Sequence, residues 1–243
     1  MSNFNDGDTV SLSGAPIYRH AESTPWAPPQ GEVCIEQISD HIETHLGKVE
    51  TVFHEIASDT VHIDVHFVKP SEGVPFARLV TSGMSDLPMT TPAEASVPQF
   101  AELMVTLPAS WRLDQKSFED ENWYWPVRLI KYLAWMPHKY KTWLGFGHSI
   151  PNGDPAEPYA ANTKLCGAIV LPSITVPGEF HTLRIDDQKE ITFYSVVPLY
   201  AEEMNLKLRS GTDELLERFS KKDVTDIISV TRPNVAKKLF GFL

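Results

Sequence analysis

Two histidines and an aspartate alternate with apolar residues along the stretch HIDVHFVKP, which begins at His62. Because side chains in a β-strand point alternately to its two faces, His62, Asp64 and His66 are predicted to share one face. Imidazole and carboxylate groups are the donors of many catalytic metal sites, so the pattern raises the hypothesis of a metal-dependent enzyme. A strand with one solvated face shows the same alternation, and a polar face or a buried hydrogen-bond network is therefore the competing interpretation.

Other chemistries find less support. His41 and His45 lie four apart in HIETH, but no glutamate directly follows the first histidine, as the HExxH hydrolase motif requires. The serine in SGMSD lacks the pattern of a nucleophile elbow, and GFG is not followed by the third glycine and helix of a phosphate-binding loop. Cys34 and Cys166 stand beside apolar residues, which predicts buried, reduced and unreactive thiols. We therefore expect a protein that is not an enzyme and has no cofactor.

The centre of the chain is rich in aromatic residues and leads into a segment of glycines and prolines. This segment, KTWLGFGHSIPNGDPAEPYAANT, shows neither helical nor strand periodicity. A loop of this length in a compact domain is typical of a functional segment. Most of the aromatic residues are expected in the core, but aromatics with a polar edge also anchor protein interfaces. The residues predicted to bind a partner are Trp143, Phe146, Gly147, His148, Asn152 and Asp154.

Composition narrows the classes of partner. The chain has 243 residues, of which 42% are hydrophobic, and a formal net charge of -11. This length allows a large core without metals or disulfides. An acidic surface repels phosphate backbones and anionic membranes, so neither nucleic acid nor a membrane is expected as a partner. The N-terminus is unlike a secretory signal and no apolar run approaches the ~20 residues that cross a bilayer, which, with reduced cysteines, predicts a cytoplasmic protein.

Hydrophobic periodicity predicts the elements that would position these residues. A first helix is expected over IEQISDHIETHL, followed by an antiparallel hairpin with its turn at Ser58-Asp59 and by two further strands, RLVTSGM and FAELMVTL. A central helix is expected to begin near Pro126 and to end at Pro137. The apolar strands LCGAIVLP and ITFYSVVPLY are expected in the middle of the sheet. Helices should follow, with a break at Gly211, as far as DVTDIIS.

This order of elements predicts an α+β fold, a single domain with a central mixed, mainly antiparallel β-sheet flanked by helices. The regular strand and helix alternation of a doubly wound fold is missing. We expect residues 1–32 to form an extended N-terminal arm, residues 33–232 the domain, and residues 233–243 a C-terminal tail.

Read together, several segments resemble the bacterial branch of the suppressor-of-fused (SUFU) domain family. The resemblance extends from about Tyr18 to Asn234, nearly the whole chain. The segments that carry it are, in order, HIETHLGKVETVFHEIASDTVHIDVHFVKP, RLVTSGMSDLPM, AELMVTLPASW, WPVRLIKYLAWMPHKYKTWLGFGHSIPNGDP and ITFYSVVPLYAEEMNLKL.

The resemblance implies a fold like the N-terminal domain of SUFU and no established enzymatic activity. Eukaryotic members regulate Hedgehog signalling by gripping a transcription-factor peptide as an added strand in a cleft between two domains. This chain looks like only the first of those domains. The eukaryotic pattern also places an aspartate before the histidine, where this chain has Gly147 before His148. Bacterial members have been proposed as immunity proteins that neutralise polymorphic toxins.

The leading hypothesis is therefore a non-enzymatic interaction domain with a protein partner, such as a toxin. An acidic domain would suit a basic, nuclease-type toxin through electrostatic steering. The alternatives are a metal-dependent enzyme that uses His62, Asp64 and His66, and a structural scaffold whose aromatic cluster lies entirely in the core.

Overall fold

An eight-stranded mixed sheet forms the centre of the structure, a computed structural model that describes residues 9–20, 31–54, 61–93 and 96–237. Its strands run in the order β3-β4-β5-β6-β10-β8-β7, and β9 pairs with β10 beside this path. Neighbouring strands are antiparallel except β6 and β10, which are parallel. The predicted α+β fold with a mixed, mainly antiparallel sheet is therefore confirmed. The strands are β3 (Val49–Phe53), β4 (Asp64–Val68), β5 (Phe76–Ser82), β6 (Phe100–Pro108), β7 (Ser149–Pro151), β8 (Leu165–Leu171), β9 (Thr182–Arg184) and β10 (Glu190–Tyr200).

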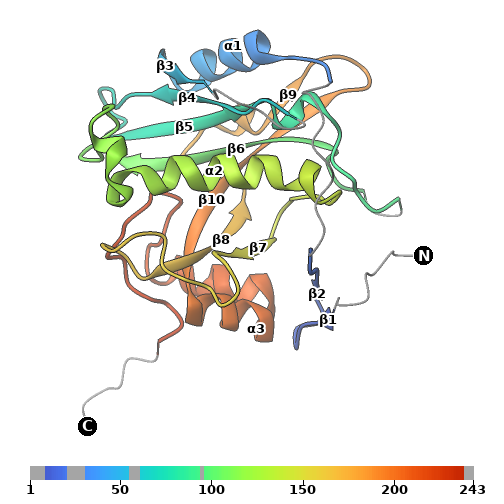
Figure 1. Cartoon of the computed structure of the whole chain (residues 1–243), viewed down its shortest axis with the longest axis vertical. Coiled ribbons are helices and arrows are strands. Elements are labelled where there is room, and N and C mark those ends of the chain that lie inside the picture. The colour runs from blue at the N-terminus through green and yellow to red at the C-terminus, as the bar shows by residue number, and fades with distance from the viewer. Residues whose placement is uncertain (1–8, 21–30, 55–60, 94–95, 238–243) are drawn as a thin grey trace.

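Three α-helices in the described residues cover the two faces of the sheet, with α1 and α3 at opposite ends of the molecule and α2 across the middle (Figure 1). Val196 of β10 points to the face that α2 covers and joins the largest core cluster. Phe193 and Leu199 point to the other face, where Phe193 packs with residues of α1 and Leu199 with residues of α3. α1 and α3 therefore share one face of the sheet. The helices are α1 (Ile35–His45), α2 (Glu121–Lys139) and α3 (Ala201–Ser220), and short 3₁₀ helices span Met84–Asp86, Ser117–Glu119 and Gly178–His181.

The first predicted elements are confirmed. Ile38 and Ile42, one turn apart on α1, are fully buried against the sheet. Gly47 follows the helix with a φ of 110°, a left-handed backbone that favours glycine and stops the helix. β3 and β4 form the predicted antiparallel pair. The predicted turn at Ser58-Asp59 lies outside the described residues.

α2 begins earlier than predicted. Its N-cap is Asp120, whose carboxylate accepts the Asn122 N–H, so Pro126 lies in the second turn. Proline cannot donate to the carbonyl one turn before it. The side-chain amide of Asn162 donates to that Asn122 carbonyl instead, at 3.3 Å. The helix also continues past Pro137, so the expectation that the two prolines bound it is wrong.

α3 shows the predicted break at Gly211, whose φ is 88°, but ends at Ser220 instead of continuing through DVTDIIS. The Asp226 carboxylate in this segment accepts hydrogen bonds from the hydroxyls of Ser173 and Ser195, at 2.6 and 3.2 Å. A nearby backbone N–H donates to a carbonyl of β6. These hydrogen bonds hold the segment against the sheet in a non-helical conformation. The prediction of a longer helix is therefore wrong.

The described part of the N-terminal arm forms a small hairpin of β1 (Thr9–Val10) and β2 (Pro16–Ile17). Between these strands, the Ser13 N–H donates to the Leu208 carbonyl of α3 at 3.0 Å. The hairpin therefore lies against α3. At the other end of the described chain, Val235 is buried with residues of the same helix.

Both cysteines are free and buried. Cys34 is the residue before α1, and Cys166 lies in β8. Burial raises the pKa of both thiols, which agrees with the prediction of buried, reduced side chains.

Candidate functional site

The predicted binding loop contains β7, a three-residue strand at one end of the sheet. Backbone hydrogen bonds tie the residues on either side of it to β8, at 2.9 Å for the His148 carbonyl and 2.8 Å for the Asn152 N–H. Alternate residues of an antiparallel strand bond to the same neighbour, so Ile150 also faces β8. The backbone groups of Ser149 and Pro151 therefore face the outer edge of the sheet.

This outer edge is open in the described part of the chain, where β8 is the only strand that pairs with β7. An exposed strand edge can accept an added strand from another chain. Ser149 offers both an outward N–H and an outward carbonyl. Pro151 has no N–H, which limits the length of the edge that can donate hydrogen bonds.

An aromatic surface lies next to this edge. The rings of Trp143 and His148 are 4.1 Å apart between centroids and tilted by 59°. Phe146 is 53% exposed, an unusual fraction for a phenylalanine in a globular domain. Leu144 between them is buried, which anchors the segment to the core.

Gly147 allows the loop to approach α3. Its φ is 78°, in the left-handed region, and its N–H donates to the Val170 carbonyl at 2.8 Å. A Cβ added at this position would lie 3.0 Å from Thr212 Oγ1 of α3, closer than nearly all such contacts. Backbone conformation and the space beside α3 therefore both favour glycine here.

His148 lies near a lysine ammonium, and both side chains have lowered pKa values. Burial, with repulsion from the Lys207 ammonium, lowers the pKa of His148 to about 4, so the imidazole is neutral at pH 7. Lys207 is 8% exposed, and burial lowers its pKa as well. Its ammonium has no hydrogen-bond acceptor among the residues that the structure describes. The site therefore offers a neutral imidazole and a largely buried cation that could bind an oxygen acceptor.

The other two predicted residues lie farther along the loop. The Asn152 side-chain amide donates to the Glu157 carbonyl at 2.7 Å and so closes a turn. Asp154 is exposed and lies 3.5 Å from the guanidinium of Arg19, between Asp154 Oδ2 and Arg19 Nη1. Asn152 shapes the loop, whereas Asp154 links it to the N-terminal segment.

Sequence reasoning missed Lys207 and Thr212, because both reach the loop from α3. No spacing within the loop could have indicated them. From the sequence alone, a lysine in an amphipathic helix is expected to be exposed to solvent. Lys207 is buried instead, because α3 packs beside the loop that contains Gly147.

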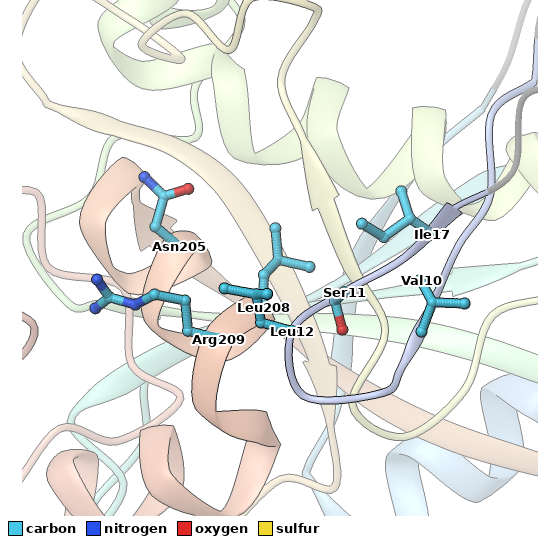
Figure 2. Close-up of a pocket in the computed structure, with 7 residues that line it drawn as sticks. All are labelled: Val10, Ser11, Leu12, Ile17, Asn205, Leu208 and Arg209. Atoms are coloured by element: carbon cyan, nitrogen blue, oxygen red, sulfur yellow. The ribbon is translucent and has the colours of Figure 1, made fainter.

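A second surface feature lies between the N-terminal hairpin and α3. The hairpin and α3 line an open hollow of about 430 Å³. In Figure 2, Leu12 of the hairpin lies beside Leu208 of α3, and the Arg209 side chain extends away from the hairpin. Leu12 at its rim is 85% exposed. Among the described residues that line it, Arg209 is the one with an ionisable side chain.

The three residues of the predicted polar strand face do not converge on one point. The His62 Nε2 lies 3.0 Å from Asp64 Oδ1, but His66 points deeper and its Nε2 contacts Ser82 Oγ at 2.9 Å. The other oxygen of Asp64 meets His54 Nδ1 at 2.9 Å. His54 was not predicted, because it comes from the end of the neighbouring strand.

A pair of buried acids was also missed. Glu102 of β6 is fully buried and accepts hydrogen bonds from Thr81, Gly83 and Ser85. Burial raises its pKa despite these donors. Burial and the neighbouring Glu102 charge raise the pKa of Asp86 to about 7. The hydrogen bonds to Glu102 hold the turn after β5 in place, and both of its carboxylate oxygens have donors within the domain. Glu102 and Asp86 therefore have a structural role.

The family described as Suppressor of fused protein (SUFU) matches residues 59–233. The chain belongs to the SUFU family. The matched range includes the strand-face residues, the β7 loop and α3. A comparison with curated proteins found no match.

Solved SUFU structures share the fold. A SUFU homologue from Neisseria gonorrhoeae has a TM-score of 0.59 at 13% identity, covering 84% of this chain and 97% of that one. The Sufu-Fu complex structure has a TM-score of 0.58 at 16% identity, covering 86% and 93%. Drosophila Suppressor of Fused has a TM-score of 0.54 at 13% identity, covering 89% of this chain but 54% of its own, so this chain spans about half of it.

The SUFU family is a family of non-enzymatic regulators, and the Sufu-Fu complex shows that a member binds a protein partner. At these sequence identities the structural likeness of this chain establishes its fold. Among the described residues, no helix is both long and apolar enough to span a membrane.

Proposed function

We propose that this SUFU domain acts without catalysis, by binding a protein partner along the outer edge of β7. The observation that carries the proposal is the open edge at Ser149 beside the exposed ring of Phe146 and the pair of Trp143 and His148. An added strand would gain main-chain hydrogen bonds at this edge. The aromatic surface would supply the side-chain contacts that select the partner.

Lys207 adds a requirement for the partner. Its ammonium is largely buried and has no acceptor among the described residues. A carboxylate or carbonyl group of the partner beside His148 would provide that acceptor and stabilise the charged form of the lysine. We therefore expect the bound segment to carry an acidic or amide side chain near this point.

The partner that we propose is a basic toxin of the nuclease type, which the domain would neutralise as an immunity protein. Support comes from the resemblance to the bacterial branch of the family and from the fold shared with the Neisseria gonorrhoeae homologue. A net charge of -11 would steer a basic partner toward the domain before the β7 edge engages it.

The edge can be tested with two substitutions at one position. Ser149→Pro removes the outward N–H and leaves the bonds to β8 intact, whereas Ser149→Ala keeps that N–H. Each form would be used to capture partners from its own cells and would be co-expressed with toxins encoded beside its gene. We expect stoichiometric capture and protection with the wild type and Ser149→Ala, and loss of both with Ser149→Pro at an unchanged melting temperature.

Phe146→Ala tests the aromatic surface, with Tyr132→Ala as the matched control. Tyr132 is 46% exposed but belongs to α2, so its loss should not affect binding. Absence of any stoichiometric partner, together with no protection, would refute the proposal. Equal binding by Ser149→Pro and wild type would place the interface elsewhere, and a pure scaffold would tolerate all four substitutions.

A further inference from the structure

A buried carboxylate between two imidazoles marks the start of β4. Asp64 Oδ2 lies 2.9 Å from His54 Nδ1, and Asp64 Oδ1 lies 3.0 Å from His62 Nε2. The three potential ligand atoms all lie within 4.8 Å of one another. Among the described residues, this is the group of histidine, cysteine and acidic side chains with the spacing of a metal site.

The backbone fixes this arrangement. The register of β3 and β4 pairs Phe53 with Val65, which places His54 directly opposite Asp64. A cross-strand pair of this kind has its Cβ atoms within about 5.5 Å. His62 precedes Asp64 by two residues and approaches it from the same chain. Two neighbouring backbone segments therefore supply all three groups, which limits how far the ligand atoms can separate.

The cluster has a buried base and an open mouth. The side chain of Asp64 is 6% exposed, whereas those of His62 and His54 are 41% and 66% exposed. A charged ligand can therefore enter between the imidazoles and reach the carboxylate.

A second observation also indicates a ligand at this end of β4. His66 follows Asp64 by two residues on the same face and is 1% exposed. Its Nε2 contacts Ser82 Oγ, but its Nδ1 is buried and has no hydrogen-bond partner in the part of the chain that the structure describes. Buried polar nitrogens are nearly always paired, so an unpaired nitrogen two residues along β4 from Asp64 is an unusual feature that a bound ligand would explain.

We propose that His54, His62 and Asp64 bind one divalent transition-metal ion of the zinc class. Two imidazole nitrogens and a carboxylate oxygen form a donor set that zinc prefers. Ligand atoms at zinc distances around a tetrahedral ion lie about 3.3 Å apart. The two nitrogen to oxygen separations, 2.9 Å to Asp64 Oδ2 and 3.0 Å to Asp64 Oδ1, would need to widen by only a few tenths of an ångström around an ion that both carboxylate oxygens face.

Three protein ligands leave a fourth position for water or for a group of a partner. The ion would join the end of β3 to the start of β4, at the opposite end of the sheet from β7. The site is thus separate from the proposed partner surface, and its existence does not rest on the proposed function.

Calorimetric titration of the untagged protein with Zn²⁺, after removal of metal by a chelator, tests the site. Titration with Co²⁺ reports the geometry through its visible absorption. We expect saturation at one ion per chain, the strong absorption of tetrahedral Co²⁺, and a higher melting temperature with Zn²⁺. Loss of an outer-shell partner alone reduces metal affinity about 10- to 100-fold, so His62→Ala should weaken binding by more than ~100-fold.

His45→Gln is the matched control. His45 belongs to the second histidine pair, on α1, where its ring lies 4.6 Å from that of His41. This variant should bind zinc as the wild type does. Because Asp64 is buried and its loss is expected to reduce stability, the half-exposed His62 is the primary site of substitution. Binding below one ion per chain, or equal affinity of His62→Ala and wild type, would overturn the proposal.

Discussion

Replacement of Arg232 by methionine tests how the segment after α3 is fastened to the domain. The Arg232 guanidinium donates to both oxygens of the Glu203 carboxylate, at 2.7 Å from Nη1 to Oε1 and 2.5 Å from Nη2 to Oε2. The Glu203 side chain is fully buried and that of Arg232 is 8% exposed. Glu203 also accepts the backbone N–H groups of Tyr200 and Val235. This carboxylate therefore ties the start of α3 to the C-terminal segment.

Methionine keeps apolar length at this position but removes the positive charge. Glu203 would then be a buried charge without its partner, which costs about 3–5 kcal/mol. Arg232 also donates to the Pro198 carbonyl and lies over the ring of Phe219, so these losses act in the same direction. For a chain of this size, 1 kcal/mol corresponds to roughly 2–4 °C, and the melting temperature should fall by roughly 6–20 °C.

Urea unfolding followed by tryptophan fluorescence measures the loss, with Arg184→Met as the matched control. Arg184 forms an ion pair with Asp187 in which the side chains are 67% and 89% exposed. Exposed pairs of this kind contribute little, so the control should stay close to wild type. Arg232→Met should therefore be clearly less stable than Arg184→Met.

A double variant separates the charge effect from simple packing. Arg232→Met combined with Glu203→Gln leaves no buried charge, so its loss of stability should be smaller than the sum of the two single losses by ~1–3 kcal/mol. If Arg232→Met loses no more stability than Arg184→Met, or if the single losses simply add, the reasoning from a buried charge pair is refuted.

Three further predictions concern the loop and the buried acids. Gly147→Ala should lower the free energy of unfolding by about 1–2 kcal/mol in urea, because alanine is strained at a φ of 78° and its Cβ would press on Thr212. The pKa of His148 is about 4 in the folded protein, against an ordinary value of 6.5, so the unfolded chain binds this proton first as the pH falls. The free energy of unfolding of the wild type should therefore decrease by up to roughly 3 kcal/mol between pH 6.5 and pH 4. Urea unfolding of His148→Gln at the same pH values should lack this decrease. Asp86 should change the free energy of unfolding in the opposite direction with pH. Its pKa is raised from 3.8 to about 7 in the folded protein, so its contribution to stability is lost as the pH rises through this range. Asp86→Asn should therefore gain stability relative to wild type between pH 4 and pH 8, by roughly 4 kcal/mol at most, and a constant difference across that range would contradict the assignment.

The fold could be predicted where local physical rules decide it. Ile38 and Ile42 repeat at helical spacing and do bury one side of α1. Gly211 interrupts α3 as the sequence indicates, because its backbone is left-handed. The apolar runs of β8 and β10 lie inside the sheet, since strands covered on both faces need no polar alternation.

The remaining features depend on partners distant in the sequence. Pro126 does not start α2, because Asn162 replaces the hydrogen bond that proline cannot make. Asp226 does not continue α3, because its carboxylate accepts hydrogen bonds from hydroxyl groups that are distant in the sequence. His54 joins Asp64 because of cross-strand register, which spacing within HIDVHFVKP cannot show. The alternation in HIDVHFVKP indicated that His62 and Asp64 lie together, whereas the second histidine at Asp64 comes from another segment.

The contact between Gly147 and Thr212 limits how far recognition in eukaryotic relatives transfers to this chain. The resemblance predicts an aspartate at this position in eukaryotic members, and aspartate tolerates a left-handed backbone better than most residues. Its Cβ would still lie 3.0 Å from Thr212 Oγ1, so the Thr212 side chain would have to move by a few tenths of an ångström. In the present packing the charge that acts on His148 is instead the Lys207 ammonium, which lowers the pKa of the imidazole. A partner that suits a carboxylate at this point would meet a cation here, so this edge should select a segment of opposite local charge.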